Sequence, residues 1–385
     1  MFTRDIRISR DDSFFLFGAR GTGKTALLRA TFTTEEALYI DLLKTSEFDS
    51  LSLNPETLLA RIAKLTDSVS WVIIDEVQKI PRLLDLVHHQ IENSRFKFAL
   101  TGSSARKLKR GSANLLAGRA VVYNLFPLTF HELGASFDLN ETLSWGTLPL
   151  IINTKSPTSR QKKLRSYAHS YLKEEIQQEQ LVRMLDPFHR FLLVAAQMNG
   201  QILNYAAISR DCGASEKSVK EYFSILEDTL LGFLLPPFHE SIRKQQRENP
   251  KFYFFDGGVQ RALSQTLRVA IEPQTYAFGR AFEAFIINEI NRRQSYQELD
   301  YSLSYLRTKD DAEIDLILER PGLPRALIEI KSAAVVHEND LTSLKRFARD
   351  FQNAEAFCLC MDPHPKKYGQ VSVLPWQLGF KELGL

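Results

Sequence analysis

The sequence predicts an α/β protein whose first domain is built on a parallel sheet. Between residues 13 and 126, short apolar runs such as SFFLFG and WVIIDEV alternate with stretches of helical periodicity, the pattern of strands joined by crossover helices. A glycine-rich segment, GARGTGKT, lies between the first apolar run and a helical stretch. The chain has 385 residues, more than one core usually holds, so further domains are expected.

Composition and charge exclude several classes of protein. Hydrophobic residues make up 44% and charged residues 25%, which favours folded domains over disorder. The 49 basic residues nearly balance the 46 acidic ones, so nucleic-acid binding must rest on local clusters. Three cysteines without histidine pairs at zinc spacing predict a reducing, cytoplasmic setting. No apolar run reaches the ~20 residues of a membrane span, and no membrane partner is expected.

The order of motifs predicts three domains. Residues 1–180 hold the parallel sheet and a mainly helical extension, in which 147–163 is expected to be a polar break. Residues 181–260 show a helix, a short helix after Asn204, a second after Ser215 and two strands, the order of a winged helix-turn-helix. Residues 261–385 show a helix, three strands, a helix and a strand, which predicts a third α/β unit.

GARGTGKT matches the P-loop pattern in full and has the strand before it and the helix after it that the motif requires. Its glycines let backbone N–H groups turn toward phosphate oxygens, and the helix presents its positive end. Lys24 is expected to reach the β and γ phosphates of ATP, and Thr25 to place its hydroxyl on Mg²⁺. The predicted nucleotide contacts in this loop are Gly18, Ala19, Arg20, Gly21, Thr22, Gly23, Lys24, Thr25 and Ala26.

WVIIDEV ends in two acids, which a buried parallel strand would place at the carboxyl edge of the sheet, where ligands bind. Asp75 is the expected magnesium ligand and Glu76 the expected general base for the attacking water. After the next strand, LTGSS offers Thr101, Ser103 or Ser104 to orient that water or sense the γ phosphate, and the choice stays open.

Arg119, in LLAGR, precedes the fifth strand. From there a guanidinium could reach the nucleotide of a neighbouring subunit as an arginine finger. A simple surface arginine is the alternative.

GARGTGKT, WVIIDEVQKIP, LTGSSARKL, LLAGR and NLFPLTFHEL together resemble the prokaryotic AAA-plus ATPases known mainly as ATP-binding proteins. NYAAISRDCGASEKSVKEYFSILEDTLLGFLL resembles the winged-helix segment of that family, and LIEIKSA resembles its nuclease-like C-terminal domain. The resemblance implies a sheet with an extra strand between the two Walker strands. It also implies Mg²⁺-dependent ATP hydrolysis in a homo-oligomer, such as a hexameric ring, whose subunits share sites.

Several basic stretches make DNA an expected partner. Lys217, Ser218 and Lys220 would project from the start of the recognition helix, although acidic neighbours weaken that surface. The expected wing tip, SIRKQQRENPK, could lie on phosphates. Its basic residues are Arg243, Lys244, Arg247 and Lys251. Two further runs, 105–119 and 155–173, are basic. Most such runs are solvated faces, but the first could face a central channel or a bound duplex. The winged helix could instead serve only as a lid.

The C-terminal unit carries a possible second catalytic site. Asp315 in AEIDLIL and Glu329 in LIEIKS would lie on neighbouring strands, and the two-residue spacing points Glu329 and Lys331 to one face. Two carboxylates can hold Mg²⁺ while a lysine steadies the attacking water, and Glu283 could complete the metal shell. The order of elements resembles the PD-(D/E)XK nuclease fold of restriction enzymes and Holliday-junction resolvases. Either this unit cuts DNA or it keeps the fold without the activity.

The resulting hypothesis is a homo-oligomeric ATPase that remodels duplex or branched DNA and carries a nuclease-like domain. The alternative is an ATP-dependent conformational switch or scaffold that acts through protein partners.

Overall fold

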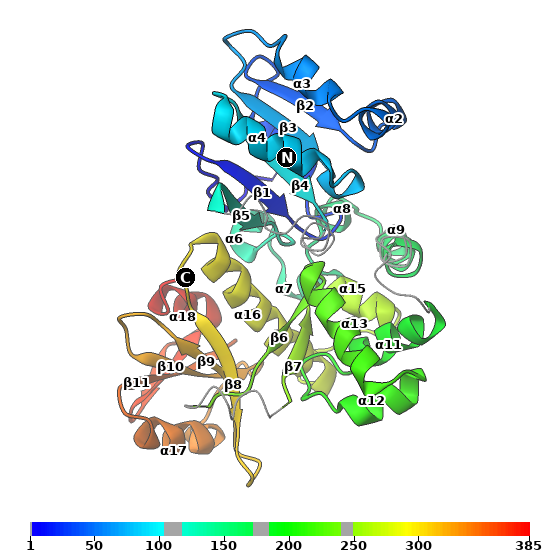
Figure 1. Cartoon of the computed structure of the whole chain (residues 1–385). Helices are drawn as coiled ribbons and strands as arrows, with labels where there is room; N and C mark the ends of the chain where they lie inside the picture. The colour runs from blue at the N-terminus through cyan, green and yellow to red at the C-terminus, as the bar shows by residue number, and fades with distance from the viewer. Residues whose placement is uncertain (1, 104–117, 172–184, 240–248) are drawn as a thin grey trace. The chain divides into compact units, whose positions relative to one another are not determined.

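The structure is a computed structural model that describes residues 2–103, 118–171, 185–239 and 249–385 (Figure 1). The chain divides into two compact units, Met1–Leu128 with Ser224–Leu231, and Thr129–Phe223 with Gly232–Leu385. The division into 1–180, 181–260 and 261–385 stays a prediction from the motifs.

Unit 1 is built on a parallel sheet of the order β2-β3-β4-β1-β5. Its elements are β1 Ser13–Phe17, α1 Lys24–Thr31, β2 Ala37–Asp41, α2 Thr45–Leu53, α3 Thr57–Ile62, β3 Trp71–Asp75, η1 Val77–Lys79, α4 Leu83–Asn93, β4 Lys97–Gly102 and β5 Ala120–Asn124. All five strands lie where the sequence predicts them. The extra strand, β4, separates the strand before the P-loop from the strand that ends in the two acids, as predicted.

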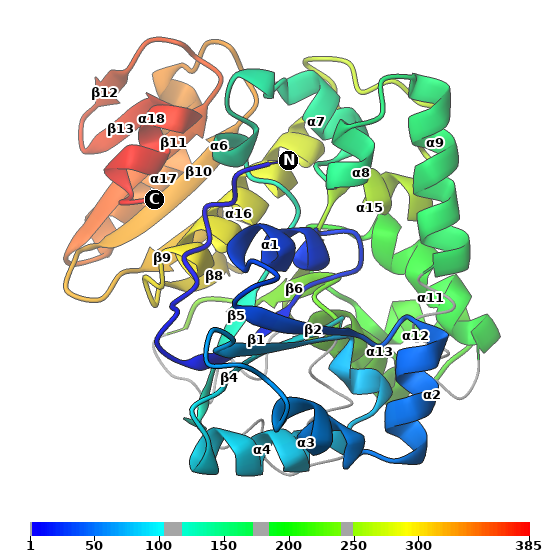
Figure 2. The ribbon, with the colours of Figure 1, turned by 90° about the horizontal axis from the view of Figure 1, so that it is seen from above.

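Alternate residues of the buried strands serve opposite faces of this sheet. Phe15 and Phe17 pack into the core that α2, α3 and α4 cover, while Phe14 points the other way and contacts Phe32 and Trp71. Figure 2 shows α1 on one side of the sheet and α3 and α4 on the other. Both faces are therefore shielded from water, and the carboxyl ends of the strands form one edge that can hold a ligand.

The first part of unit 2 is helical. Its elements are α6 Phe130–Leu133, η3 Gly134–Ser136, α7 Leu139–Trp145, α8 Pro149–Ile152, α9 Pro157–Ser166 and η4 Tyr167–Tyr171. The polar break predicted at 147–163 is wrong, because α8 and α9 lie within it. Each of these helices has a proline in its first turn, where the missing N–H costs nothing. Polar residues in this stretch lie on the helices that these prolines begin.

The predicted helix-turn-helix elements follow at the expected residues. They are α11 Leu185–Gln197, α12 Tyr205–Cys212, α13 Glu216–Asp228 and the antiparallel strands β6 Gly232–Leu235 and β7 Lys251–Phe254. A helix that was not predicted, α15 Gly257–Leu263, follows them. Asn204 caps α12 by accepting the N–H of Ala207 at 3.0 Å, and Ser215 accepts the N–H of Ser218 at 3.1 Å. Helix α13 runs across the boundary between the two units.

The C-terminal part of unit 2 is a six-stranded mixed sheet of the order β12-β13-β11-β10-β9-β8. Its elements are α16 Tyr276–Tyr296, β8 Ser302–Arg307, β9 Glu313–Glu319, β10 Arg325–Lys331, η5 Glu338–Leu341, α17 Thr342–Asp350, β11 Ala354–Cys360, β12 Lys366–Tyr368, β13 Val371–Pro375 and α18 Trp376–Glu382. Residues of α16 and α18 share one core with this sheet, and residues of α17 share another core with its other face.

A buried acid lies on α16. Glu289 is fully buried, and it accepts hydrogen bonds from the backbone N–H of Phe130 at 3.1 Å and from Arg292 at 3.2 Å. Burial raises the pKa of Glu289 to about 7, although Arg292 and the Phe130 N–H act in the opposite direction. The carboxyl group therefore holds its proton more tightly in the folded chain than in the unfolded one.

This raised pKa predicts a pH-dependent stability. Below pH 4.5 both states are protonated, and from there to about pH 7 only the unfolded state releases the proton, so stability falls as the pH rises. The loss is on the order of 3 kcal/mol. The urea midpoint of the wild type should therefore fall more between pH 5 and pH 8 than that of Glu289→Gln, while the exposed Glu272→Gln should follow the wild type. Parallel profiles for wild type and Glu289→Gln would contradict this assignment.

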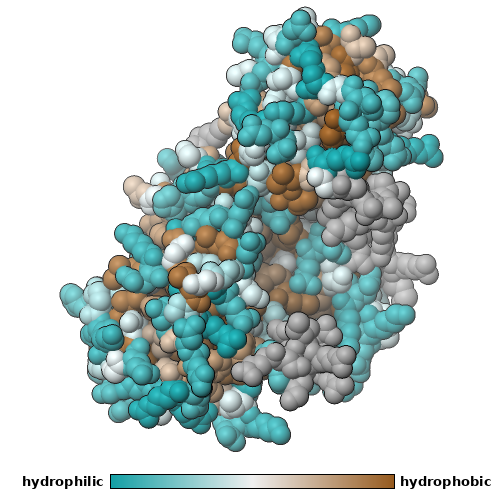
Figure 3. Space-filling model, turned by 60° about the vertical axis from the view of Figure 1, so that its left-hand side comes forward, coloured by the Kyte–Doolittle hydropathy of each residue, from teal (hydrophilic) through white to brown (hydrophobic). Residues whose placement is uncertain are grey.

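Hydrophilic residues prevail on the face shown in Figure 3, and hydrophobic residues form separate patches there. Within the described parts of the chain, no helix combines the length and the apolar character needed to cross a bilayer.

Candidate functional site

The loop between β1 and α1 has the backbone that the P-loop motif requires. A Cβ on Gly18 would lie 2.5 Å from the carbonyl oxygen of Leu125, so only glycine fits there. Gly21 and Gly23 have φ of 83° and 101°, in the left-handed region that glycine adopts without strain. The first-turn N–H groups of α1 have no intrahelical acceptors and are available to an anion.

Lys24 lies over this loop. Its side chain is 5% exposed, and its ammonium donates to the carbonyl oxygen of Gly18 at 2.7 Å. Arg4, which the sequence did not single out, donates to the carbonyl oxygens of Thr22 and Phe126, both at 2.7 Å. The loop is thus tied to the segment that follows β5.

The carboxylate of Asp75 joins the P-loop to the neighbouring strands. It is 1% exposed and accepts hydrogen bonds from three hydroxyls, those of Thr25 at 2.7 Å, Tyr39 at 2.6 Å and Thr101. Burial and the Asp75 carboxylate raise the pKa of Tyr39, so this phenol stays a donor. The sequence predicted that Thr25 and Asp75 would meet, but Tyr39 was missed because nothing in ALYID distinguishes it from an ordinary strand residue.

Glu76 follows directly and has an unusual backbone. Its φ is 62°, a conformation rare outside glycine and often found at functional sites. The N–H of Glu76 donates to the hydroxyl of Thr101 at 3.1 Å, and its carboxylate accepts from the Gln78 amide at 2.5 Å. The same amide lies 3.3 Å from the Ser103 hydroxyl. Thr101 therefore contacts both acids, Ser103 contacts Gln78, and Ser104 lies outside the described residues.

Arg119 lies away from this edge. It precedes β5, whose parallel register with β1 pairs Ala120 with Ser13, so Arg119 is at the amino end of the sheet. Its guanidinium pairs with Glu92 at 2.5 Å, and both side chains are about two-fifths exposed. It cannot serve the nucleotide site of its own chain from there, and a role at a neighbouring subunit's site stays a prediction.

The site fits a nucleotide with its metal. An oxygen ligand from a threonine and one from a buried carboxylate, already in contact, are the kind of donors that Mg²⁺ takes. Gly18 leaves no room for a side chain in the cradle, and Lys24 supplies the only lysine charge in the loop. The remaining predicted contacts, Ala19, Arg20 and Ala26, lie in the loop or the first turn of α1.

The four residues predicted in the C-terminal unit come together in part. Asp315 accepts the backbone N–H of Ile330 at 2.7 Å, and Glu329 pairs with Lys331 at 2.6 Å. Burial raises the pKa of Asp315 well above its usual range, and Glu329 and Glu283 raise it further. These carboxylates are thus close enough to repel one another.

A second lysine lies among these acids. Lys251 was predicted to lie near the wing tip on phosphates, but its side chain is only 5% exposed and pairs with Glu313 at 2.5 Å and Glu283 at 3.8 Å. The Tyr253 hydroxyl also donates to Glu283 at 2.7 Å. Burial lowers the pKa of Lys251, but Glu283, Glu313 and Asp315 outweigh it and raise the pKa. We call Lys251, Glu283, Glu313, Asp315, Glu329 and Lys331 the buried charged cluster.

The cluster lacks the geometry of a metal site in this structure. In the described ranges, no three or more histidine, cysteine, aspartate or glutamate side chains are placed to hold a metal ion. Lys251 gives the physical reason, because its ammonium neutralises the same carboxylates that would bind a cation. The sequence could not have shown this, since Lys251 and Glu313 are 62 positions apart and meet only through the fold.

The strand order, the glycine cradle and the Thr25–Asp75 contact define a P-loop nucleotide-binding domain. Comparison with protein families agrees: residues 10–134 match the model of an AAA domain, which supports an AAA-type ATPase. Residues 136–269 and 278–378 match two domains of unknown function, DUF8612 and DUF4143.

The chain is similar to proteins that are themselves uncharacterized. It is 26% identical over 312 residues to one from Mycobacterium tuberculosis and to one from Mycobacterium bovis, matches that cover 80% of this chain and 68% of each relative. It is 22% identical over 382 residues to one from Methanocaldococcus jannaschii, with 91% of this chain and 80% of the relative covered.

Proposed function

We propose that this protein is a homo-oligomeric ATPase that binds duplex or branched DNA and couples ATP turnover to its remodelling. The observation that carries the ATPase part is the direct contact between the Thr25 hydroxyl and the Asp75 carboxylate, beside the glycine cradle. The contact lies at the carboxyl edge of a parallel sheet, where ligands bind, and it brings together two oxygen groups that suit a metal-bound nucleotide.

Each residue of the nucleotide site has a distinct role. The loop N–H groups bind the phosphates, and Lys24 leaves Gly18 to neutralise the charge of the β and γ oxygens. Thr25 and Asp75 would hold Mg²⁺, which when bound there would polarise the phosphates. Glu76 takes the proton of the attacking water. Thr101 contacts the Asp75 carboxylate and the Glu76 backbone, and so fixes the positions of the two acids relative to each other.

Basic residues on α13 support the DNA part of the proposal. Lys217 and Lys220 are exposed near the start of this helix, and the Lys220 ammonium lies 5.1 Å from the centre of the Tyr205 ring. Exposed cations at the start of the second helix are where helix-turn-helix proteins contact DNA. The wing residues Arg243, Lys244 and Arg247 lie outside the described residues.

A second candidate function is a conformational switch or scaffold with an inert nuclease-like domain. The buried charged cluster favours it over strand cutting, because Lys251 satisfies Glu313 and Glu283 without a metal. Cutting of DNA by Asp315, Glu329 and Lys331, with Glu283 as a further metal ligand, would require that ammonium to leave first.

A gel-shift panel of linear, forked and four-way DNA, with a slowly hydrolysed ATP analogue, tests the DNA part. We expect binding to weaken with salt, because Lys and Arg release counterions from phosphates. Lys217→Ala with Lys220→Ala should raise Kd about tenfold and reduce the salt slope by about two. Lys381→Ala, another exposed lysine, is the control. Absence of binding to every DNA at low salt would favour the scaffold, and cutting with Mg²⁺ or Mn²⁺ would argue against an inert cluster.

A further inference from the structure

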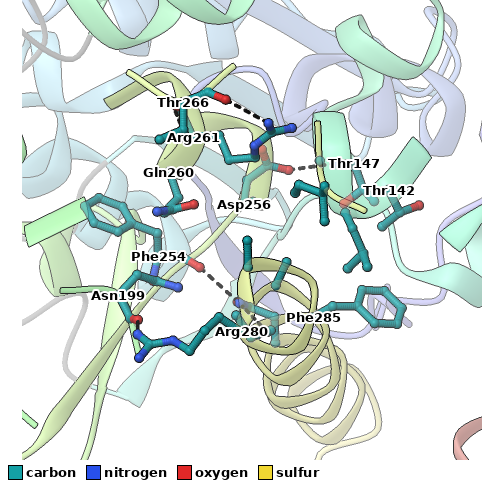
Figure 4. Close-up of a pocket in the computed structure, with 18 of the residues that line it drawn as sticks. Thr142, Thr147, Asn199, Phe254, Asp256, Gln260, Arg261, Thr266, Arg280 and Phe285 are labelled. Carbon is teal, nitrogen blue, oxygen red and sulfur yellow. Dashed lines mark hydrogen bonds between the residues drawn. The ribbon is translucent and has the colours of Figure 1, made fainter. Parts of the chain in front are cut away.

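Unit 2 contains a pocket of about 230 Å³ that neither the ATPase site nor the buried charged cluster uses. Figure 4 shows its walls, which come from α7, the segment after α11, the β7–α15 connection and α16. This volume is far above the roughly 10–15 Å³ that one water molecule needs by the same measure, so the pocket suits a ligand the size of an amino acid or a small aromatic acid. Tyr276, 78% exposed, lines it and marks the side open to solvent.

The lining is rich in positive charge. Arg261, Arg280 and Arg292 line the pocket, whereas Asp256 is the only carboxylate among the lining residues. Arg292 is paired with Glu289. Within the described residues, Arg261 and Arg280 make no ion pair, and Arg261 bonds only to backbone carbonyl oxygens.

Asp256 makes no ion pair with these arginines within the described residues, although its charge acts on Arg292, and backbone N–H groups occupy its oxygens. One accepts the N–H of Thr147 at 2.7 Å and the other the N–H of Val259 at 3.0 Å, which caps α15. Burial also raises the pKa of Asp256, against the effect of these hydrogen bonds. The pocket therefore keeps an excess of positive charge in a partly buried place, where charge attraction is stronger than in water.

Arg280 is the side chain best placed to meet a ligand. Figure 4 shows it extending from α16 toward Asn199, to whose carbonyl oxygen it donates. It also donates to the Tyr276 hydroxyl at 3.1 Å. These two bonds use two of its five N–H donors, and both acceptors are neutral. A planar oxyanion could take the remaining donors in the paired geometry that arginine favours.

The rest of the lining suits the body of an organic molecule. Gln197, Gln201 and Gln260 offer side-chain amides, and Phe254, Ala281 and Phe285 supply apolar surface. The lining thus combines apolar surface with many polar groups, and small-molecule sites use such directed polar groups to orient a ligand. We propose that this pocket binds a small organic oxyanion, a carboxylate or phosphate monoester of about ten non-hydrogen atoms, with its charged group on Arg280.

Such a ligand would act next to the buried charged cluster. Arg280 and Glu283 are three residues apart on α16, and Phe254 of the pocket follows Tyr253, which bonds to Glu283. Binding would therefore brace the helix and the strand that hold Lys251 and Glu283 together.

Calorimetric titration of the full chain tests the proposal, with ADP present to occupy the P-loop. The probes are benzoate, phenyl phosphate, the neutral isostere benzamide, and inorganic phosphate. We expect at least one organic anion to bind and benzamide to bind at least tenfold more weakly. Arg280→Met should weaken binding of the anion about tenfold to a hundredfold, because a charge-assisted hydrogen bond is lost. Arg280→Lys should bind with intermediate affinity, and the exposed Arg210→Met should match the wild type.

Three results would overturn the proposal. The first is that neither organic anion binds at about 10 mM, a concentration that detects very weak complexes. The second is binding that Arg280→Met leaves unchanged, which would place the ligand elsewhere. The third is inorganic phosphate that binds as tightly as the organic anions, which would mean an adventitious ion only. Circular dichroism melting of each variant separates loss of binding from loss of the fold.

Discussion

Replacing Lys24 by alanine should abolish ATP hydrolysis. The Lys24 ammonium lies 2.7 Å from the Gly18 carbonyl oxygen in the glycine cradle, and no other lysine lies in the loop. Loss of such a group removes transition-state stabilisation, so kcat should fall at least about a hundredfold to a thousandfold. Among the described residues, the Lys24 ammonium donates one hydrogen bond, to the Gly18 carbonyl oxygen, and makes no ion pair, so the fold should survive. Steady-state phosphate release, with circular dichroism as a check of folding, measures both expectations.

Glu76→Gln is the matched variant for this experiment. It keeps Lys24 and Thr25, so nucleotide should still bind, while turnover should fall because the base is lost. The exposed Lys44→Ala should behave as wild type. ATP turnover that survives intact in Lys24→Ala would refute the assignment of the ATPase site. Loss of nucleotide binding in Glu76→Gln would mean that Glu76 binds the nucleotide and does not act as the base.

The nucleotide site could be predicted from the sequence because its parts are local. Lys24 and Thr25 belong to one loop, and the end of a buried strand fixes the position of Asp75 at the ligand-binding edge. Pairing between strands then brings these groups together, as the Thr25–Asp75 contact shows. The sequence analysis missed Tyr39 and Arg4. Their long side chains reach the site from positions where no sequence motif marks a functional residue.

The C-terminal unit was predicted less completely, for two physical reasons. The short edge strand β12 and its partner β13 have no regular alternation of apolar and polar residues. They are strands because they pair across the sheet, and not because of their local propensity. The buried charged cluster depends on Lys251, which belongs to a different sheet from Asp315 and Glu329. Opposite charges that meet through tertiary structure leave no trace in the spacing of a sequence.

Replacing Lys251 by methionine should therefore destabilise the protein strongly. The Lys251 side chain is 5% exposed and pairs with Glu313 and Glu283, so its removal leaves two partly buried carboxylates without this counter-charge. Such a loss costs about 3–5 kcal/mol, measured as the change in unfolding free energy in urea. The cost should be greater at pH 8 than at pH 5, because removing the cation raises the pKa of Asp315 further and the acids must then ionise unpaired.

Lys345→Met is the control, because its partner Glu338 is largely exposed, and a pair at the surface is worth about 1 kcal/mol or less. Adding Glu283→Gln to Lys251→Met should recover part of the lost stability, since one of the unpaired charges is removed. If Lys251 occupies the place of a metal ion, Mn²⁺ should stabilise Lys251→Ala but not the wild type, because only the variant leaves its carboxylates free. Equal stabilisation of both by Mn²⁺ would show that the lysine and the cation bind at different places, and the case for an inert cluster would fail.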